Sequence, residues 1–427
     1  MNLWKAKSPD GQAAIERLLT RGSQILAPET LDRAAGIVAD VRREGDAALL
    51  RYARALDGAA AETAAELALE ASPPGPEDLP AGFVEAMEEA IAAVERFHAP
   101  QVRQGYVQEE DGITLEERIE PLRRVGVYVP GGRAAYPSTV VMTVVPARVA
   151  GVQEIAVATP PGSWHANAAL RWTLGRLGVH EVWGMGGAHA VAAFAYGTET
   201  IRRVDKIVGP GNAWVTAAKK LVVGDVAIDG IAGPSEVVIV SDASGTASHL
   251  AADLLAQAEH DPQAAAVLIT SDPALGERVA AEVGRQLHSL YTAETARASL
   301  ARFGGALVVD SLDEAVELVN RIAPEHLQLV GREAEQLAGR ITAAGAVFLG
   351  PSTPEVFGDY IAGPSHVLPT CGSARFASSL GVEDFLRRSH HIRFTREAAA
   401  RRAAAAAILA DAEGLPAHAA SARRRLP

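Results

Sequence analysis

The chain has 427 residues, which is long for a single hydrophobic core and predicts two to four structural units. Its 48% hydrophobic and 22% charged residues are ordinary for a globular protein, and a net charge of −12 without a long basic run argues against nucleic acid and anionic membranes as partners. A single cysteine, Cys371, excludes an intrachain disulfide, and the sequence has neither a secretion signal after Met1 nor a membrane span, so we expect a cytoplasmic protein.

The first half of the sequence changes in character after Arg123. Residues 28–97 carry alanine, leucine and charged residues at helical spacing, and we expect them to be mostly helical. Short β-branched or apolar stretches follow at residues 125–130, 139–149, 154–159, 179–184 and 204–209, with a helix at 166–177. We interpret these stretches as strands. Their alternation with helices predicts a parallel, doubly wound sheet.

A second alternating series begins with the apolar run at residues 236–240. We expect helices at residues 247–259, 274–287 and 312–322, with strands at 265–271 and 306–310. The alanine-rich segment 397–412 has good helix propensity. Gly414 and Pro416 are its stop signals, so the chain is expected to end in a helical tail.

The sequence APEHL at residues 323–327 places a carboxylate beside an imidazole. Glu325 and His326 are two proton acceptors with intrinsic pKa values of about 4.3 and 6.5, which suits a reaction that removes protons in two steps. Neighbours on a regular strand point to opposite faces, so both can serve one site only if the backbone turns there, as Pro324 allows. On its own the pair favours a plain surface turn, because Glu-His is a common dipeptide.

Two glycine-rich turns follow predicted strands. VWGMGGAH at residues 182–189 partly matches a dinucleotide-binding fingerprint, but His189 occupies the third glycine position and Asp205 precedes a strand instead of ending one. GPGN at residues 209–212 lacks the Lys and Ser or Thr of a phosphate loop. Both segments are compatible with plain tight turns, although ligands bind at the carboxyl ends of parallel strands.

A metal site is a further possibility. Gln257 and His260 lie three residues apart near the end of a predicted helix and therefore share a face. With Asp359 and His418 they would supply nitrogen and oxygen ligands suited to zinc or a similar ion. Sequence spacing does not bring these segments together. His260 can instead be a cation at a helix C-terminus, and His418 can belong to a frayed tail.

A series of segments along nearly the whole chain closely resembles the L-histidinol dehydrogenase family, which carries out the last two oxidations of histidine biosynthesis. These segments are VGVYVPGG (125–132), VDKIVGPGNA (204–213), AGPSE (232–236), QAEH (257–260), APEHL (323–327), GDY (358–360), AGPSHVLP (362–369), ARF (374–376) and EGLPAH (413–418). They occur in the family's order, and together they are far more specific than any one alone.

The resemblance implies a zinc ion and a homodimer with shared active sites. Zinc would be bound by Gln257, His260 and Asp359 of one subunit and His418 of the other, and it would orient L-histidinol through its amine and imidazole nitrogens. The implied substrate contacts are Ser235, Gln257, His260, His326, Asp359, His366, Glu413 and His418. Glu413 would pair with the substrate ammonium. Without the resemblance, Ser235 would be a turn residue and His366 an exposed loop imidazole.

The resemblance also implies the roles of the catalytic pair and of NAD. His326 would be the general base for the alcohol, and Glu325 would activate water that adds to the aldehyde, with two NAD molecules taking the hydrides. Tyr128, His189 and Asn212 would contact NAD. The family usually has Gln where this chain has His189, and an imidazole cannot reproduce both ends of an amide, so that contact is expected to differ.

The fold implied by the resemblance is α/β, with two incomplete Rossmann-like domains that contain parallel sheets. Small helical segments at both ends are expected to pack on the partner subunit. The expected division is an N-terminal helical segment (1–24), a larger domain with the catalytic and metal residues (25–127 and 238–378), an NAD-binding domain (128–237) and a C-terminal tail that reaches the partner's active site (379–427).

Three other functions remain open at this point. A paralogous dehydrogenase for another alcohol, such as a sulfonated diol, is disfavoured by Glu413 and His418, which would read histidinol and hold the metal. A zinc-dependent hydrolase with Glu325 as its base would work without NAD. A non-catalytic metabolite-binding protein would show no turnover.

Overall fold

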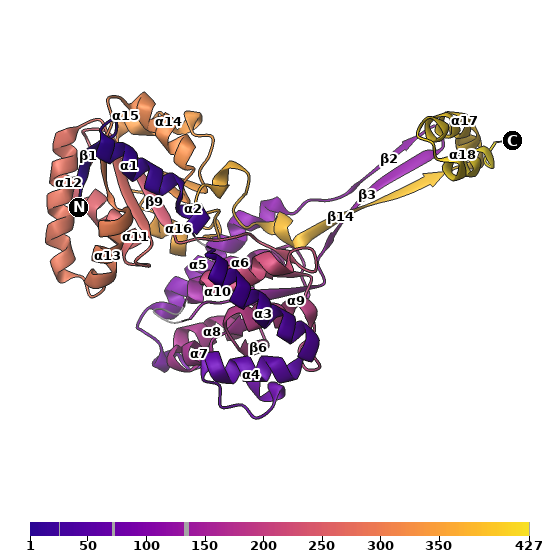
Figure 1. Cartoon of the computed structure of the whole chain (residues 1–427), viewed down its shortest axis with the longest axis horizontal. Helices are drawn as coiled ribbons and strands as arrows, with labels where there is room; N and C mark the ends of the chain where they lie inside the picture. The colour runs from indigo at the N-terminus through magenta and orange to yellow at the C-terminus, as the bar shows by residue number, and fades with distance from the viewer. Residues whose placement is uncertain (25, 71–72, 132–135, 427) are drawn as a thin grey trace.

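Two parallel sheets form the body of the protein, and an arm of three antiparallel strands projects from it (Figure 1). The computed structural model describes residues 1–24, 26–70, 73–131 and 136–426. Gly132, the last residue of the first family segment, lies outside the described residues. The predicted α/β class with two parallel sheets is confirmed.

The larger sheet has six parallel strands in the order β1-β11-β10-β9-β12-β13. The strands are β1 (Leu3–Lys5), β9 (Glu236–Ser241), β10 (Ala265–Thr270), β11 (Gly305–Val308), β12 (His326–Val330) and β13 (Ala346–Leu349). Helices α1 (Pro9–Leu19) and α14 (Leu312–Ile322) pack on one face, and α11 (Ala247–Ala258), α12 (Pro273–Gln286) and α13 (Ala293–Phe303) contribute to the core on the other. Strands β9, β10 and β12 are buried throughout, and the interiors of β9 and β10 are accordingly continuous apolar runs.

The smaller sheet has five parallel strands in the order β6-β5-β4-β7-β8. The strands are β4 (Arg124–Tyr128), β5 (Glu154–Thr159), β6 (Glu181–Gly184), β7 (Lys206–Val208) and β8 (Ala227–Ile228). One core contains residues of α3 (Pro28–Glu44), α4 (Asp46–Asp57), α9 (Gly187–Tyr196) and α10 (Ala213–Val222). The other contains residues of α5 (Phe83–His98), α6 (Pro137–Val149), α7 (Pro161–Ala166) and α8 (Ala168–Arg176).

The packing of the N-terminal third differs from the expected domain division. Helices α3, α4 and α5 pack on the five-stranded sheet, whereas the expected division places residues 25–127 with residues 238–378. Residues 1–24 are not a separate helical segment, because β1 joins the six-stranded sheet and α1 is part of its core. An amphipathic pattern shows that a helix has a buried face but does not show which sheet covers it.

One predicted strand is wrong. Residues 139–149 lie in helix α6, which begins with Pro137 at its first position. The side chains from Thr139 to Ala147 are all buried, so the segment has no polar face and its pattern does not separate helix from strand. Its length was the better guide, because a fully buried strand is usually shorter. The Thr143 hydroxyl donates to the Thr139 carbonyl oxygen (2.6 Å), one turn earlier in the helix.

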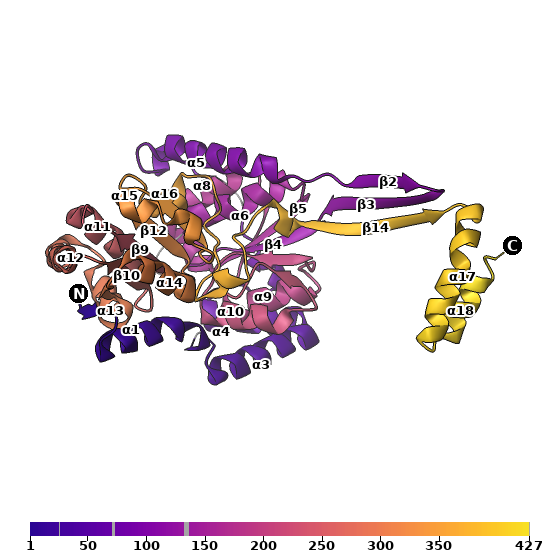
Figure 2. The same cartoon turned by 90° about the horizontal axis from the view of Figure 1, so that it is seen from above.

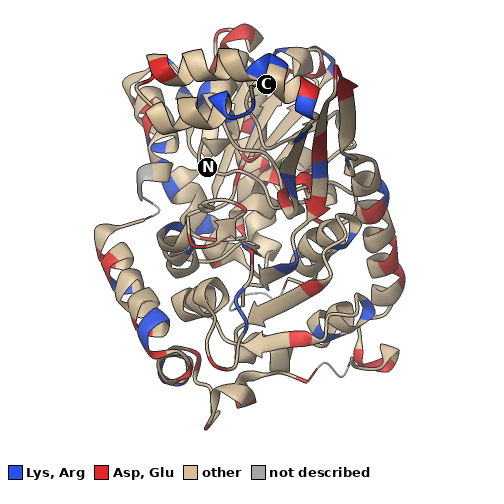
Figure 3. Cartoon of the chain, turned by 90° about the vertical axis from the view of Figure 1, so that its right-hand side faces the viewer, with Lys and Arg blue, Asp and Glu red and all other residues tan. Residues whose placement is uncertain are grey.

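The antiparallel arm was not predicted. It consists of β2 (Tyr106–Glu110), β3 (Ile113–Pro121) and β14 (Leu386–Phe394), and it carries helices α17 (Arg396–Ala412) and α18 (Pro416–Arg423) at its far end (Figures 1 and 2). Strand β14 carries arginines, whereas β2 and β3 carry mainly glutamates, so opposite charges face each other across the arm, where Arg387 pairs with Glu120 (Figure 3). The two helices pack on each other and stand clear of the body in both views.

Each parallel sheet with its helices forms one unit of the body. The unit with the six-stranded sheet also contains the short helices α15 (Arg332–Glu335) and α16 (Val356–Tyr360), and α2 (Arg21–Gln24) follows α1. Among the described residues, no helix combines the length and the apolar character needed to cross a bilayer.

Candidate active site

The Glu325–His326 pair lies at the amino end of β12, in a turn that follows α14. Helix α14 has a strongly apolar buried face and ends at Ile322, and the capping residue Ala323 adopts a left-handed conformation (φ 51°) before Pro324. This turn places both side chains on one site, with His326 Nδ1 3.7 Å from Glu325 Oε2. The turn that the sequence required is therefore present, although it lies at the amino ends of the strands and not at the carboxyl ends.

Glu236, the first residue of the neighbouring strand β9, contacts both members of the pair. Its backbone N–H donates to Glu325 Oε2 (2.9 Å), and its carbonyl oxygen lies 3.2 Å from His326 Nδ1. A carbonyl oxygen can only accept, so Nδ1 carries the proton in this arrangement and Nε2 is the free acceptor. The backbone of one residue therefore orients two side chains.

Burial moves the pKa values of the pair toward each other. Both side chains are almost completely buried, which raises the pKa of Glu325 well above its usual value and lowers the pKa of His326. The imidazole is thus kept neutral, and the carboxylate becomes a stronger base than an exposed glutamate. A neutral imidazole beside a carboxylate of raised pKa provides two groups that can each accept a proton, as stepwise proton removal requires.

Asp359, His260 and His366 surround the pair. After burial, the Asp359 charge is among the causes that raise the pKa of Glu325, and His260 and His366 oppose protonation of His326. Asp359 lies on α16, and its carbonyl oxygen is 3.2 Å from His366 Nδ1. The other ring nitrogen of His366 is 3.3 Å from Thr139 Oγ1 on α6. His366 therefore bridges the two units of the body.

Ser235 and Gln257 belong to the same neighbourhood. The Ser235 hydroxyl donates to the Glu325 carboxylate and helps to lower its pKa against the effect of burial. Gln257 is buried near the end of α11, three residues before the exposed His260, and its side-chain nitrogen has no hydrogen-bond partner. A buried side-chain amide nitrogen without a partner is uncommon in proteins, and it fits a Gln257 side chain that binds a ligand through its amide oxygen.

The body alone does not assemble the complete expected metal set. Within the described residues, no three His, Cys, Asp or Glu side chains are grouped so as to hold a metal ion. His418 is exposed on α18, and Glu413 is exposed at the end of α17. Both helices stand at the far end of the arm (Figure 2), so one chain does not bring these residues to Glu325 and His326.

The expected nucleotide residues lie at the carboxyl ends of the five-stranded sheet. Tyr128 ends β4, Asn212 caps α10, and the glycine turn after β6 leads into α9. A side chain at Gly209 would place its Cβ 2.2 Å from the Tyr128 carbonyl oxygen, so this close approach requires glycine. Without side chains, the glycine turns allow a phosphate group to approach the backbone closely and to accept hydrogen bonds from its N–H groups.

His189 is fully buried and supports the glycine turn. Its Nε2 lies 2.8 Å from Asp57 Oδ2, and the same oxygen accepts a hydrogen bond from the Gly186 N–H (2.7 Å). Tyr128 is also buried, which raises its pKa to about 12, and its hydroxyl oxygen accepts from the Gly187 N–H (3.2 Å). Asn212 is exposed, and its side-chain oxygen caps α10. Of the three residues, Asn212 alone is open to solvent.

Sequence reasoning missed three side chains of the site, Glu236, Glu355 and Phe348. Glu355 is buried with Oε2 3.9 Å from His326 Nδ1, and that oxygen has no hydrogen-bond partner. The Phe348 ring lies 6.0 Å from the imidazole of His326. The spacing of Glu355 and Asp359, four residues apart, was the one available signal that both belong to the same helical turn.

Glu355→Gln is expected to stabilise the protein by about 1–3 kcal/mol at neutral pH, the cost of a buried polar group without a partner. Burial raises the folded-state pKa of Glu355 well above 4.5, so wild-type stability is retained at low pH and is lost as the pH rises toward that pKa. The gain in melting temperature should therefore be larger at pH 7.5 than at pH 5. Glu277→Gln, at an exposed position, is the control. An equal gain at both pH values would contradict the charge argument.

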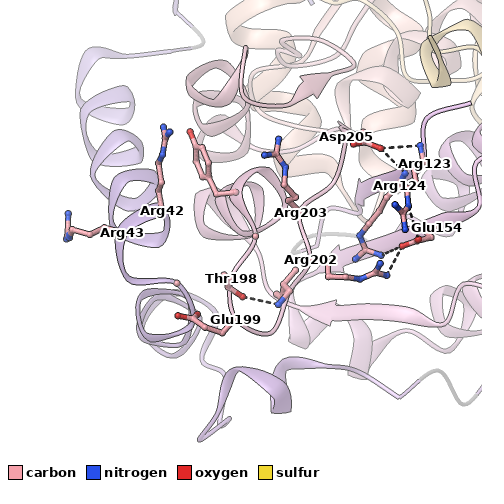
Figure 4. Close-up of a pocket in the computed structure, with 14 residues that line it drawn as sticks. Arg42, Arg43, Arg123, Arg124, Glu154, Thr198, Glu199, Arg202, Arg203 and Asp205 are labelled. Atoms are coloured by element: carbon pink, nitrogen blue, oxygen red, sulfur yellow. Dashed lines mark hydrogen bonds and ion pairs between the residues drawn. The ribbon is translucent and has the colours of Figure 1, made fainter.

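A cavity of about 760 Å³ lies at the amino ends of the strands of the five-stranded sheet, opposite to the glycine turns (Figure 4). Arginines from several segments line it, and Glu154 pairs with Arg123, Arg124 and Arg202. Asp205 accepts hydrogen bonds from the N–H groups of Arg123 and Arg124 at this edge, away from the glycine turns. The cavity is therefore separate from the catalytic pair, and Asp205 is not placed to read a ribose.

The family model and the relatives similar in sequence share one description. The family model for histidinol dehydrogenase matches residues 21–426. The chain is 46% identical to histidinol dehydrogenase 2 of Nostoc sp., covering 98% of this chain and 97% of the relative. It is 47% identical to histidinol dehydrogenase of Geobacter sulfurreducens, with 91% and 92% covered. The crystal structure of histidinol dehydrogenase from Elizabethkingia anophelis matches with a TM-score of 0.86 at 31% identity, covering 100% of this chain and 98% of that chain.

Proposed function

Because the chain belongs to the histidinol dehydrogenase family and is thus an oxidoreductase, we propose that it oxidises L-histidinol through L-histidinaldehyde to L-histidine. The observation that carries this proposal is the buried Glu325–His326 pair, whose two acceptors are oriented by one residue, Glu236. A four-electron oxidation requires proton removal in each of two steps, and adjacent acceptors with different protonation behaviour suit that sequence.

When bound, NAD would accept the hydride in each oxidation, and zinc would hold the substrate by its amine and imidazole nitrogens. Gln257, His260 and Asp359 would be ligands from the body, with His418 of the partner subunit as the fourth. These are nitrogen and oxygen donors of the kind that zinc accepts. The exposed position of His260 and the unpaired amide of Gln257 support this assignment.

His326 is the proposed base for the alcohol. Its Nδ1 is engaged with the Glu236 carbonyl oxygen, so Nε2 is the atom that takes the hydroxyl proton. The lowered pKa keeps the ring neutral and ready to accept at physiological pH. Asp359, whose charge favours the protonated ring, would stabilise the imidazolium that results.

Glu325 is the proposed base for the second oxidation. Its carboxylate would take a proton from the water molecule that adds to the bound aldehyde, and the raised pKa makes it suited to hold that proton. His326, 3.7 Å away, would release the first proton to solvent and then remove the hydroxyl proton of the hydrated aldehyde as the second hydride leaves for NAD. Burial of both residues would limit the escape of the reactive aldehyde and the entry of competing water.

The remaining substrate contacts are proposed from residues around the pair. Ser235 already bonds to Glu325, and His366 bridges the two units of the body, so both border the space where a substrate would bind. Glu413 of the partner subunit would meet the substrate ammonium. A carboxylate in this place would favour an amino alcohol over an uncharged one.

The glycine turns of the five-stranded sheet are the proposed NAD site. Asn212 is exposed beside the turn at residues 209–212 and can offer its amide nitrogen directly. We propose that Tyr128 and His189 support NAD binding indirectly. Tyr128 accepts a hydrogen bond from the Gly187 N–H, and His189 contacts Asp57, which accepts from the Gly186 N–H. The altered contact expected at His189 would then be an indirect one.

We further propose that the active unit is a homodimer in the cytoplasm, where one free cysteine, Cys371, is compatible with the reducing conditions. The arm and its helices expose large apolar side chains, including Val107, Ile392, Ile408 and Leu409. Apolar surface of this kind on a projecting segment is typical of protein interfaces. A second copy that covered it could receive Glu413 and His418 at its own catalytic pair.

NADH formation with L-histidinol tests the function. We expect two NADH for each L-histidine formed, measured by absorbance at saturating NAD and by quantification of histidine. One NADH per turnover would indicate a simple alcohol dehydrogenase, and no NADH would contradict the proposal. A sulfonated diol is the matched alternative substrate, and preference for it would favour the paralogue. Product formation without NAD would favour the hydrolase.

A further inference from the structure

We propose that the buried ion pair between Arg21 and Glu236 is a positioning device that holds both catalytic side chains in register. The inference rests on the proposed function, because it concerns how Glu325 and His326 are oriented for the two proton transfers. Arg21 and Glu236 are both buried and neither is among the proposed substrate contacts, so both would act through the catalytic pair and not on the substrate itself.

Glu236 is joined to the catalytic turn through both its backbone and its side chain. Its backbone N–H and C=O groups contact Glu325 Oε2 (2.9 Å) and His326 Nδ1 (3.2 Å). Its carboxylate oxygen Oε1 accepts from the backbone N–H groups of Glu325 (3.3 Å) and Cys371 (2.8 Å). The side chain thus fixes the turn that carries the pair, while the main chain fixes the orientation of the two functional groups.

Arg21 holds the other carboxylate oxygen of Glu236. Its Nη1 lies 2.6 Å from Glu236 Oε2, and both side chains are about 97–98% buried. Nη2 donates to the carbonyl oxygens of Pro234 (3.2 Å) and Gln263 (2.7 Å). One guanidinium therefore ties the residues before β9 and β10 to the carboxylate that holds the catalytic turn.

Stability alone is a weak reason to bury such a pair. Removing two charges from water costs free energy, and apolar side chains of similar volume often stabilise a core equally well. A second buried arginine, Arg124, pairs with Glu181 at the amino end of the five-stranded sheet, away from the catalytic pair. What distinguishes Arg21 is its ion pair with Glu236, the residue whose carboxylate and backbone together contact both catalytic residues.

The test compares Arg21→Met, Arg21→Lys and Glu236→Gln with the matched control Arg124→Met in the full-length enzyme loaded with zinc. The measured quantities are kcat and KM with L-histidinol and with L-histidinaldehyde, together with melting temperature and zinc content. All assays are run well below the lowest melting temperature of the set, so that loss of fold does not enter the comparison.

For Arg21→Met we expect kcat to fall about 10–100-fold with both substrates, because displacement of reacting groups by about 1 Å costs this much. KM and zinc content should remain within about threefold of wild type, since the ligands themselves are unchanged. Arg21→Lys should recover part of kcat, because it restores one charged contact. Arg124→Met should keep the wild-type kcat even if its melting temperature falls equally.

Two results would overturn the positioning role. The first is a wild-type kcat in both Arg21→Met and Glu236→Gln. The second is a loss of kcat in Arg124→Met that matches the loss in Arg21→Met at equal melting temperature. If Arg21→Met does not fold, Arg21→Lys and Glu236→Gln decide the question by the same comparison. Absence of histidinol oxidation in the wild type would instead refute the proposed function.

Discussion

His326→Asn is expected to lower kcat for L-histidinol by about 10²–10⁴-fold, the usual contribution of a general base. Asparagine can keep a hydrogen bond to the Glu236 carbonyl oxygen through its amide nitrogen, but it offers no basic nitrogen in place of Nε2. The loss should therefore reflect missing proton transfer more than misplaced backbone. Steady-state NADH formation with the alcohol measures it directly.

Glu325→Gln should show the complementary pattern. Glutamine preserves the size of the side chain and can still accept from the Glu236 N–H, but it cannot take a proton from water. Oxidation of L-histidinaldehyde should fall by a similar factor of about 10²–10⁴, while a single turnover of the alcohol stays near the wild-type rate. Rapid-mixing measurements of the first and second NADH separate the two steps.

The comparison is sharpened by Cys371→Ser, a change beside the site that leaves the catalytic pair intact. Cys371 contacts Glu236 through its backbone N–H, and a serine keeps that bond. Its two rates should therefore stay near those of the wild type. Equal impairment of His326→Asn and Glu325→Gln with both substrates would refute the division of labour between the two bases.

Local pattern predicted much of the fold because most strands and helices here are short, regular and separated by clear turns. Strands such as β9 and β10 and helices such as α14 and α17 fall close to their expected bounds. The exception, α6, is apolar on every side, so its period carries no information. The arm was missed because its strands are rich in charged residues and because β3 also pairs with β14, which is distant in sequence.

The candidate site divides in the same way. Glu325, His326, Asp359 and His366 were assigned to one site through the resemblance of short segments to the family, and the structure brings these four together. Glu236, Arg21 and Glu355 were not found from the sequence. These residues matter through contacts with residues far apart in the sequence, and such contacts cannot be recognised from a single sequence. His189 shows the opposite case: the position was found, but its burial against Asp57 was not foreseeable from the turn.

The position of Glu413 and His418 predicts that activity depends on residues from two subunits. Helices α17 and α18 stand clear of the body, so we expect each chain to complete its partner's site and not its own (Figure 1). His326→Asn and His418→Ala homodimers should each be nearly inactive. The first lacks the proposed base, and the second lacks a proposed zinc ligand, which should show as reduced zinc content.

Mixing the two variants should restore activity that neither has alone. In a mixed dimer, the body with an intact His326 would meet the tail with an intact His418, while the other site would carry both defects. Random exchange of subunits after mild denaturation and refolding should therefore give about a quarter of wild-type activity, since half of the dimers are mixed and each has one good site of two. The two variants refolded separately are the controls. If each tail served its own body, no mixture could contain a site with both residues intact, and the activity of the mixture would stay at the level of the controls.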